Sequence, residues 1–166
     1  MKTWTWLVAA LSAITVAAAA CTGGGGGSSV SPATSPAPGL TQSDSGEGGV
    51  TVEASWLTAA ELDADSDLAD AAAAYPIESF LLVRVRMDTH SGDLSSYDLA
   101  AGSEMVVDGG PPQAAVAWRP LGGSSHHREA LLVFERPQGA ASVEVTLKDL
   151  AGVARRVFRW APLPGG

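Results

Sequence analysis

The sequence predicts an all-β protein, with a single immunoglobulin-like (Greek-key) β-sandwich of about seven strands at residues 50–161. Hydrophobic and polar residues alternate over most of this range, which is the period of a strand with one buried face. Clusters rich in glycine and proline separate the alternating runs and indicate turns. The chain has 166 residues, of which 46% are hydrophobic, and this suits one core of ordinary size.

The alternation begins at Val50 and continues in a longer run over residues 77–87. In that run its phase shifts near Leu81 and Leu82, which indicates either a bulge or a strand buried on both faces. Further strands are expected at residues 105–107, 114–118, 130–134, 143–147 and 157–160, with turns at 108–112, 122–123, 137–139 and 151–152.

Residues 58–75 interrupt this pattern and predict a short acidic, partly helical insertion after the first strand. Aspartate near the start of residues 67–74 and proline at position 76 favour a helix there, and a further helical turn is expected at 95–100. The spacing of Asp63, Asp65 and Asp67 matches only the start of an EF-hand calcium loop. Leucine and alanine stand where that loop requires glycine and glutamate, so a solvated acidic loop is expected instead.

The first 20 residues have the pattern of a secretory signal peptide. A positive start, Met1-Lys2, precedes an uncharged apolar stretch over residues 3–20. A permanent membrane span is less favoured, since no lysine or arginine follows to anchor it. The remainder of the chain is therefore expected outside the cytoplasm.

The sequence Ala18-Ala19-Ala20-Cys21 resembles the lipobox of bacterial lipoproteins, although that family usually has leucine where Ala18 stands. The resemblance implies a covalent diacylglycerol on Cys21, which anchors the chain to the outer face of a bacterial membrane. The alternative is ordinary cleavage after Ala20, which leaves a free thiol. Because Cys21 is the sole cysteine, an intrachain disulfide framework is excluded.

Residues 21–49 are expected to form the lipidated cysteine and a flexible linker. Glycine, serine, proline and threonine make up 21 of the 28 residues after the cysteine. The segment therefore contains too few apolar residues for their burial to offset the entropy lost on ordering. A flexible linker of this length has a mean end-to-end distance of roughly 30 Å. Residues 162–166 are expected to form a C-terminal tail.

The formal net charge of −8 argues against nucleic acid as a partner, because phosphate binding needs a basic surface. The charge is uneven: residues 44–108 hold 14 acids and two arginines, while residues 109–166 hold four acids and seven basic residues. Whether the two signs lie on different faces of the domain is left open. No glycine-rich phosphate loop is present at a strand–helix junction.

The histidines are His90, His126 and His127, and they fall beside two predicted strands. If these strands are neighbours and antiparallel, the imidazoles meet at one pole of the sandwich. Together with Asp88 they would suit Cu²⁺ or Zn²⁺, with Asp88 as a ligand or as the acceptor that orients an imidazole. A structural polar cluster is the alternative. A hydrolase based on Ser91 or Ser125 is least favoured, since no nucleophile-elbow pattern is present, and no enzymatic activity is expected.

Large and charged residues near the strands give further expectations. Trp56, Trp118 and Trp160 are expected to anchor the core, with an exposed sugar-binding platform as the alternative. Arg156 shares the apolar face of the last strand and predicts a buried or rim ion pair, whereas Arg155 and Arg159 share the opposite, solvated face.

Three segments look similar to a set of uncharacterised secreted prokaryotic proteins: residues 88–91, residues 122–127 and residues 151–160. The resemblance implies that these loops belong to one domain type over residues 50–161, and it implies no activity. We therefore expect a membrane-anchored extracytoplasmic lipoprotein with a non-enzymatic binding β-sandwich and a His-based metal site. The alternative is an envelope protein–protein interaction or assembly module with structural histidines.

Overall fold

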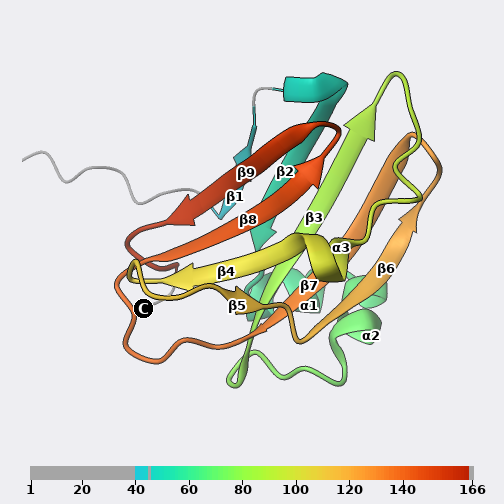
Figure 1. Ribbon diagram of the computed structural model, residues 1–166. Coiled ribbons are helices and arrows are strands. Elements are labelled where there is room, and N and C mark those ends of the chain that lie inside the picture. The colour runs from blue at the N-terminus through green and yellow to red at the C-terminus, as the bar shows by residue number, and fades with distance from the viewer. Residues whose placement is uncertain (1–39, 45, 165–166) are drawn as a thin grey trace, which may run out of the picture. The chain divides into compact units, whose positions relative to one another are not determined.

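Two antiparallel β-sheets pack on each other in the computed structural model, which describes residues 40–44 and 46–164 (Figure 1). The five-stranded sheet has the order β1-β2-β3-β7-β6, and the four-stranded sheet has the order β5-β4-β8-β9. The strands are β1 (Thr41–Ser43), β2 (Val50–Trp56), β3 (Phe80–Thr89), β4 (Ser103–Val107), β5 (Gln113–Ala114), β6 (Ala117–Gly123), β7 (His127–Glu135), β8 (Val143–Leu150) and β9 (Val153–Trp160). The predicted all-β sandwich is confirmed.

The core lies between the sheets and is formed by alternate residues of both. Trp56 of β2 and Trp160 of β9 are buried there and meet edge to face, with ring centroids 5.8 Å apart. These two tryptophans anchor the core as predicted. Trp118 is half-buried beneath the Arg128 guanidinium, whose carbon lies 5.1 Å from a ring centroid. The three rings therefore form no exposed platform.

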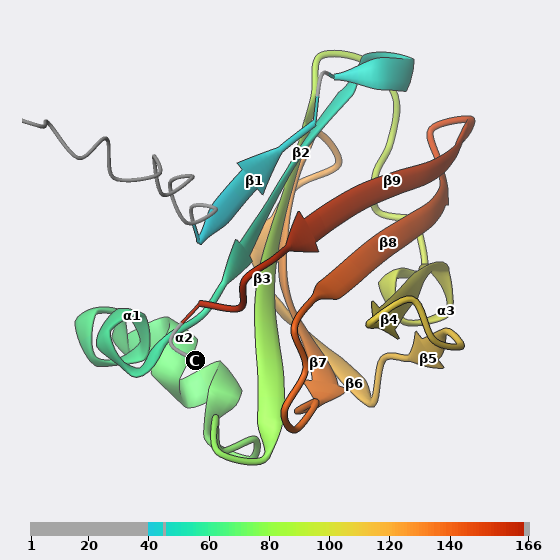
Figure 2. The ribbon, with the colours of Figure 1, turned by 90° about the vertical axis from the view of Figure 1, so that its left-hand side faces the viewer.

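The middle of the five-stranded sheet is buried on both faces. Leu81 and Val83 point into the sandwich, while Leu82 points outward, into a second apolar cluster with Leu131 and Val133. Two short helices, α1 (Ala59–Ala64) and α2 (Ser66–Ala72), cover this outer patch, and Figure 2 shows them on the side of the sheet away from β8 and β9. The phase shift in the sequence thus marks a doubly buried strand, as one of the two interpretations predicted.

The acidic insertion has a structural role that the sequence did not predict. Leu68 of α2 is buried against the outer patch, so the apolar side of the insertion closes a second core. Asp65 caps the start of α2, because its carboxylate accepts a hydrogen bond of 3.1 Å from the Leu68 amide. In the part of the chain that the structure describes, no cluster of acidic residues has the arrangement of a metal site.

The folded unit begins earlier than the expected boundary at Val50. Strand β1 pairs with β2, with Thr41 opposite Ser55, and a 3-10 turn, η1 (Glu47–Gly49), follows it. Polar side chains fix this segment: both Gln42 and Asp44 bond to β9. The expectation of a flexible linker is therefore wrong for residues 41–44 and 46–49, because specific hydrogen bonds replace the missing apolar burial.

Two other element boundaries differ from the expectation. The strand predicted at 114–118 is two strands, because the chain leaves the four-stranded sheet after Ala114 and joins the five-stranded sheet at Ala117. The helical turn predicted at 95–100 is α3 (Leu99–Gly102), which begins later because Asp98 caps it through the amides of Ala100 and Ala101. Leu163, in the expected C-terminal tail, packs on the core.

The expected signal peptide, Cys21 and residues 22–39 lie outside the described residues. Within the part that is described, no helix is long and apolar enough to span a membrane.

Candidate functional site

The pairing of β3 with β7 brings the two histidine segments to one end of the five-stranded sheet. The strands are antiparallel, and Asp88 lies directly opposite His127. One residue further, the Thr89 amide donates to the His126 carbonyl at 2.9 Å. The two strands are therefore neighbours and antiparallel, and His90 lies just beyond the last residue of β3.

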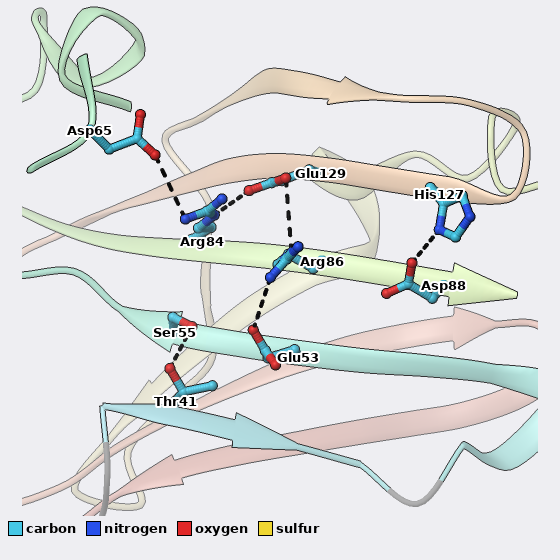
Figure 3. Close-up of polar contacts among 9 residues, drawn as sticks. All are labelled: Thr41, Glu53, Ser55, Asp65, Arg84, Arg86, Asp88, His127 and Glu129. Atoms are coloured by element: carbon cyan, nitrogen blue, oxygen red, sulfur yellow. Dashed lines mark hydrogen bonds and ion pairs between the residues drawn. The ribbon is translucent and has the colours of Figure 1, made fainter. Parts of the chain in front are cut away.

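His127 and Asp88 form a side-chain pair on the outer face of this sheet. The Nδ1 atom of His127 is hydrogen-bonded to a carboxylate oxygen of Asp88 (Figure 3). The His127 side chain is 70% exposed. When the imidazole is neutral, Nδ1 carries the proton that Asp88 accepts, so the lone pair of Nε2 is free on the far side of the ring. A carboxylate that orients an imidazole in this way is the usual companion of a metal-binding histidine.

The other two histidines do not join this pair. His90 and His126 are both exposed, and within the described residues no three histidine, cysteine, aspartate or glutamate side chains are grouped closely enough to hold a metal ion. The loop expected over residues 122–127 is also shorter. Gly122 and Gly123 belong to β6 and His127 begins β7, so only residues 124–126 form the turn. Ser124 holds that turn by accepting hydrogen bonds from the amides of His126 and His127.

Gly123 is required by the close approach of β6 to the start of β7. A Cβ atom at this position would lie 2.2 Å from the His127 carbonyl oxygen and 2.8 Å from the Arg128 Cα. Because the two glycines carry no side chains, the sheet surface beside His127 is hollowed. The hollow is open, has a volume of about 220 Å³, and is lined by Arg86, Asp88, Gly122, Gly123, His127, Arg128 and Glu129.

A row of ion pairs continues from the hollow along the outer face of the five-stranded sheet (Figure 3). Arg84 donates through Nε to Glu129, and its guanidinium also lies 3.9 Å from Asp65. Arg86 is held more loosely, at 3.8 Å from Glu53 and 3.9 Å from Glu129. The row therefore joins β2, β3 and β7 to the N-cap residue of α2, and Arg86 is the less engaged of its two cations.

Two further groups of charges lie on the two outer faces of the sandwich. Acidic residues cover α1 and α2, on the outside of the five-stranded sheet: Glu61, Asp63, Asp67 and Asp70. The outer face of the four-stranded sheet carries Lys148, Arg155 and Arg159, which pair with Glu104 and Glu144. The charge asymmetry of the sequence is therefore an asymmetry between faces as well.

Arg156 is buried between the sheets, as its place on the apolar face of β9 predicted. Its side chain is 1% exposed and forms an ion pair with Asp44. It also donates to the carbonyl oxygens of Glu47 and Val50. Asp44 is not recognisable as the partner from the sequence, because it falls in the range expected to form the flexible linker. The one available signal was that a buried arginine requires an acidic partner somewhere in the chain.

A second open hollow lies beside the loop after β3 and contains Tyr97 and Asp149. The Tyr97 hydroxyl donates to the Lys148 carbonyl at 2.7 Å. Burial, followed by the nearby Asp149 carboxylate, raises the pKa of Tyr97 to about 12. In the same loop, hydrogen bonds from the side chain and the amide of Ser95 lower the pKa of Asp93. This hollow is therefore acidic, and its phenol stays protonated at neutral pH.

Ser91 and Ser125, the serines considered for hydrolysis, form hydrogen bonds through their backbone carbonyls. The Ser91 carbonyl accepts from the Thr89 hydroxyl, and the Ser125 carbonyl accepts from the Leu94 amide. Neither hydroxyl is hydrogen-bonded to a histidine in the described part of the chain. No protein-family model, curated protein or solved structure matches this chain.

Proposed function

We propose that this chain is a bacterial lipoprotein, anchored through Cys21 outside the cytoplasmic membrane, whose β-sandwich binds a transition-metal ion, Cu²⁺ or Zn²⁺, at His127. The observation that carries the metal part of the proposal is the hydrogen bond between Asp88 and Nδ1 of His127. It fixes the ring and leaves Nε2 for the ion, while Asp88 acts as the orienting acceptor. His90 and His126 lie in exposed segments beside this end of the sheet and make secondary contributions to binding.

Binding of Cu²⁺ and of Zn²⁺ by calorimetry tests this function, with the untagged chain that begins at residue 22. His127→Ala is expected to abolish stoichiometric binding. Asp88→Asn is expected to weaken it about 10–100-fold, because the ring loses its orienting carboxylate. His90→Ala and His126→Ala should each weaken binding less than His127→Ala. Equal binding by the unchanged chain and the His127→Ala variant would overturn the metal function.

The membrane anchor is tested separately in bacterial cells. The unchanged chain is expected to partition into detergent and to carry the mass of a diacylglycerol on Cys21. A Cys21→Ser variant should remain in the aqueous phase at the mass of the unmodified chain. A soluble wild-type chain cleaved after Ala20 would contradict lipidation and support ordinary secretion.

We further propose that the sandwich is of the immunoglobulin-like, Greek-key type. The sheet order β2-β3-β7-β6 facing β5-β4-β8-β9 supports this. With the strands from β2 to β9 named A, B, C, C′, D, E, F and G in chain order, the sheets read A-B-E-D and C′-C-F-G. The first of these is one sheet of a constant-type immunoglobulin domain, and the second is the other sheet with one added edge strand. An experimental structure of the domain would test this assignment.

A second candidate function is contact with an envelope protein. It is favoured by the outer face of the four-stranded sheet, where Lys148, Arg155 and Arg159 surround Val157, which is 48% exposed. This face carries three cations against the two carboxylates of Glu104 and Glu144, so an acidic partner would be the complementary one. Crosslinking from position 157 in cells tests this candidate, and the same crosslinker at Thr51, on the opposite outer face, is the control. Equal capture from both positions would count against a specific contact.

A further inference from the structure

We infer that the hollow beside His127 binds a metal ion as its complex with a small carboxylate chelator, rather than as the bare ion. This inference rests on the proposed metal function and names the form in which the metal is bound. Three features of the described residues carry it: the number of protein ligands, the hollow itself, and the charge around it.

The protein fixes too few ligands for a bare ion. Zinc takes four ligands in structural sites and three protein ligands with one open position in catalytic sites. Here a single imidazole, that of His127, is held in place by a carboxylate, and the described residues contain no group of three potential ligands. An ion bound at Nε2 therefore keeps coordination positions that a second molecule can occupy.

The hollow offers space for that molecule. Its volume of about 220 Å³ is below that of pockets that hold drug-sized ligands, which start at about 300 Å³, so it suits a smaller compound. Its surface includes the backbone of Gly122 and Gly123, where no side chain stands in the way. A small chelator can therefore approach the sheet surface beside the imidazole.

One cation at the hollow, Arg86, is available to an anionic molecule. Both acids that line it are engaged, Asp88 by His127 and Glu129 by Arg84. The Arg86 side chain is 52% exposed, and its closest acidic contacts, at 3.8 and 3.9 Å, are longer than hydrogen bonds. Its N–H groups are therefore free to donate to a carboxylate, for which a guanidinium is well shaped.

The sheet register places the two recognition groups at a suitable separation. Arg86 lies opposite Glu129, and His127 is two residues from Glu129 along β7. Such diagonal neighbours on one face are about 7–8 Å apart, within reach of a long side chain. His127 would then take one position on the metal while Arg86 holds a carboxylate of the chelator. A bare dication would gain nothing from the exposed guanidinium of Arg86, which is also a cation.

Two copper complexes of opposite charge separate these possibilities. Both are used with the full mature chain carrying His90→Ala and His126→Ala, so that His127 is the sole histidine. The 1:1 complex of Cu²⁺ with nitrilotriacetate is an anion, whereas that with diethylenetriamine is a dication, and each leaves a position for one imidazole. We expect the anionic complex to bind at least about tenfold more tightly in calorimetry.

Variants then assign the effect to single residues. Arg86→Gln should lower the affinity for the anionic complex by about tenfold and leave that for the cationic complex equal or higher. Arg155→Gln, on the other outer face, removes the same charge and should change neither affinity. His127→Ala should abolish both. Unfolding curves and circular dichroism confirm that each variant is folded.

The outcomes distinguish the inference from the function on which it rests. If both complexes bind equally and Arg86→Gln has no effect, but His127→Ala abolishes binding, the chelate inference is overturned and the metal site stands. If neither complex nor free Cu²⁺ binds even the chain with all three histidines, the metal function fails and the inference with it.

Discussion

The carboxylate of Asp44 and the guanidinium of Arg156 form a buried ion pair between residues that are 112 positions apart in the sequence. It joins the segment before β2 to the last strand. Removing one partner of such a pair leaves an unpaired buried charge, which costs far more than the loss of a surface ion pair.

Asp44→Ala is therefore expected to lower the free energy of unfolding by about 3–5 kcal/mol. Urea denaturation followed by tryptophan fluorescence measures this loss. Glu53→Ala, which removes the surface pair with Arg86, is the matched control and should cost about 0–1 kcal/mol. A chain that begins at Val50 should lose at least as much as Asp44→Ala, because it lacks both β1 and this carboxylate. Equal losses in the free energy of unfolding for the two point variants would show that the Asp44–Arg156 pair contributes no more than a surface ion pair.

The turn between β8 and β9 contains strain that a substitution can relieve. Leu150 pairs with Val153, and the two residues between them have positive φ, 53° at Ala151 and 77° at Gly152. Hairpin turns with this backbone favour Asn-Gly, because alanine is strained in the left-handed region. Ala151→Asn should raise stability by about 1 kcal/mol and the melting temperature by about 3–5 °C. Ala154→Asn, one residue into β9, should give no gain in the same thermal scan.

Comparing Gly123 with its neighbour Gly122 separates the effect of a close backbone contact from the effect of losing a glycine. Gly123→Ala places a methyl group against the His127 carbonyl and should destabilise the β6–β7 hairpin by about 1–3 kcal/mol. Gly122→Ala meets no atom within 4 Å and is the control. Because the clash falls on His127 itself, Gly123→Ala should also weaken copper binding more than Gly122→Ala does. Indistinguishable unfolding curves would contradict the observed approach of the two strands.

The raised pKa of Tyr97 predicts that the folded protein loses stability at alkaline pH. Its pKa is raised by burial to about 12, against about 10 in an unfolded chain. As the pH rises, the unfolded chain thus releases the phenolic proton before the folded chain does. The contribution of the protonated phenol to the free energy of unfolding is therefore fully present below pH 10 and is lost as the pH rises from about 10 through about 12. Tyr97→Phe should show a shallower decline over this range when unfolding is measured at successive pH values. Its stability at pH 7 should be lower by about 1 kcal/mol, since the Lys148 carbonyl loses a hydrogen bond.

The strands of the sandwich could be predicted because alternation is a local property of the sequence. Arg156 and Trp160 were assigned to the buried side of β9 from their spacing alone, and both are buried. Strand β1 could not be predicted in this way, since Thr41-Gln42-Ser43 contains no apolar residue to alternate. What holds it is Gln42, whose side chain bonds to the backbone of Arg159.

The candidate site was predictable in outline and not in detail. Charged and imidazole side chains at the ends of two strands indicated a shared pole. The pairing of Asp88 with His127, however, depends on the register between β3 and β7, which long-range packing decides. The extent of the turn before His127 depends likewise on which glycines enter the sheet. Gly123 does so because β6 passes too close to β7 for any larger residue.

Under the proposed anchoring through Cys21, the position of Leu40 has a mechanical consequence. The Leu40 carbonyl accepts one hydrogen bond from the Trp56 amide, at 2.8 Å, and another from the Trp160 indole, at 3.1 Å. Trp56 ends β2 in one sheet, and Trp160 ends β9 in the other. A pulling force that enters the domain at Leu40 is therefore shared by both layers from the first residue that carries it. The sandwich resists such a load as a unit, because the edge strand β1 cannot be peeled from β2 without also breaking the bonds of its segment to β9.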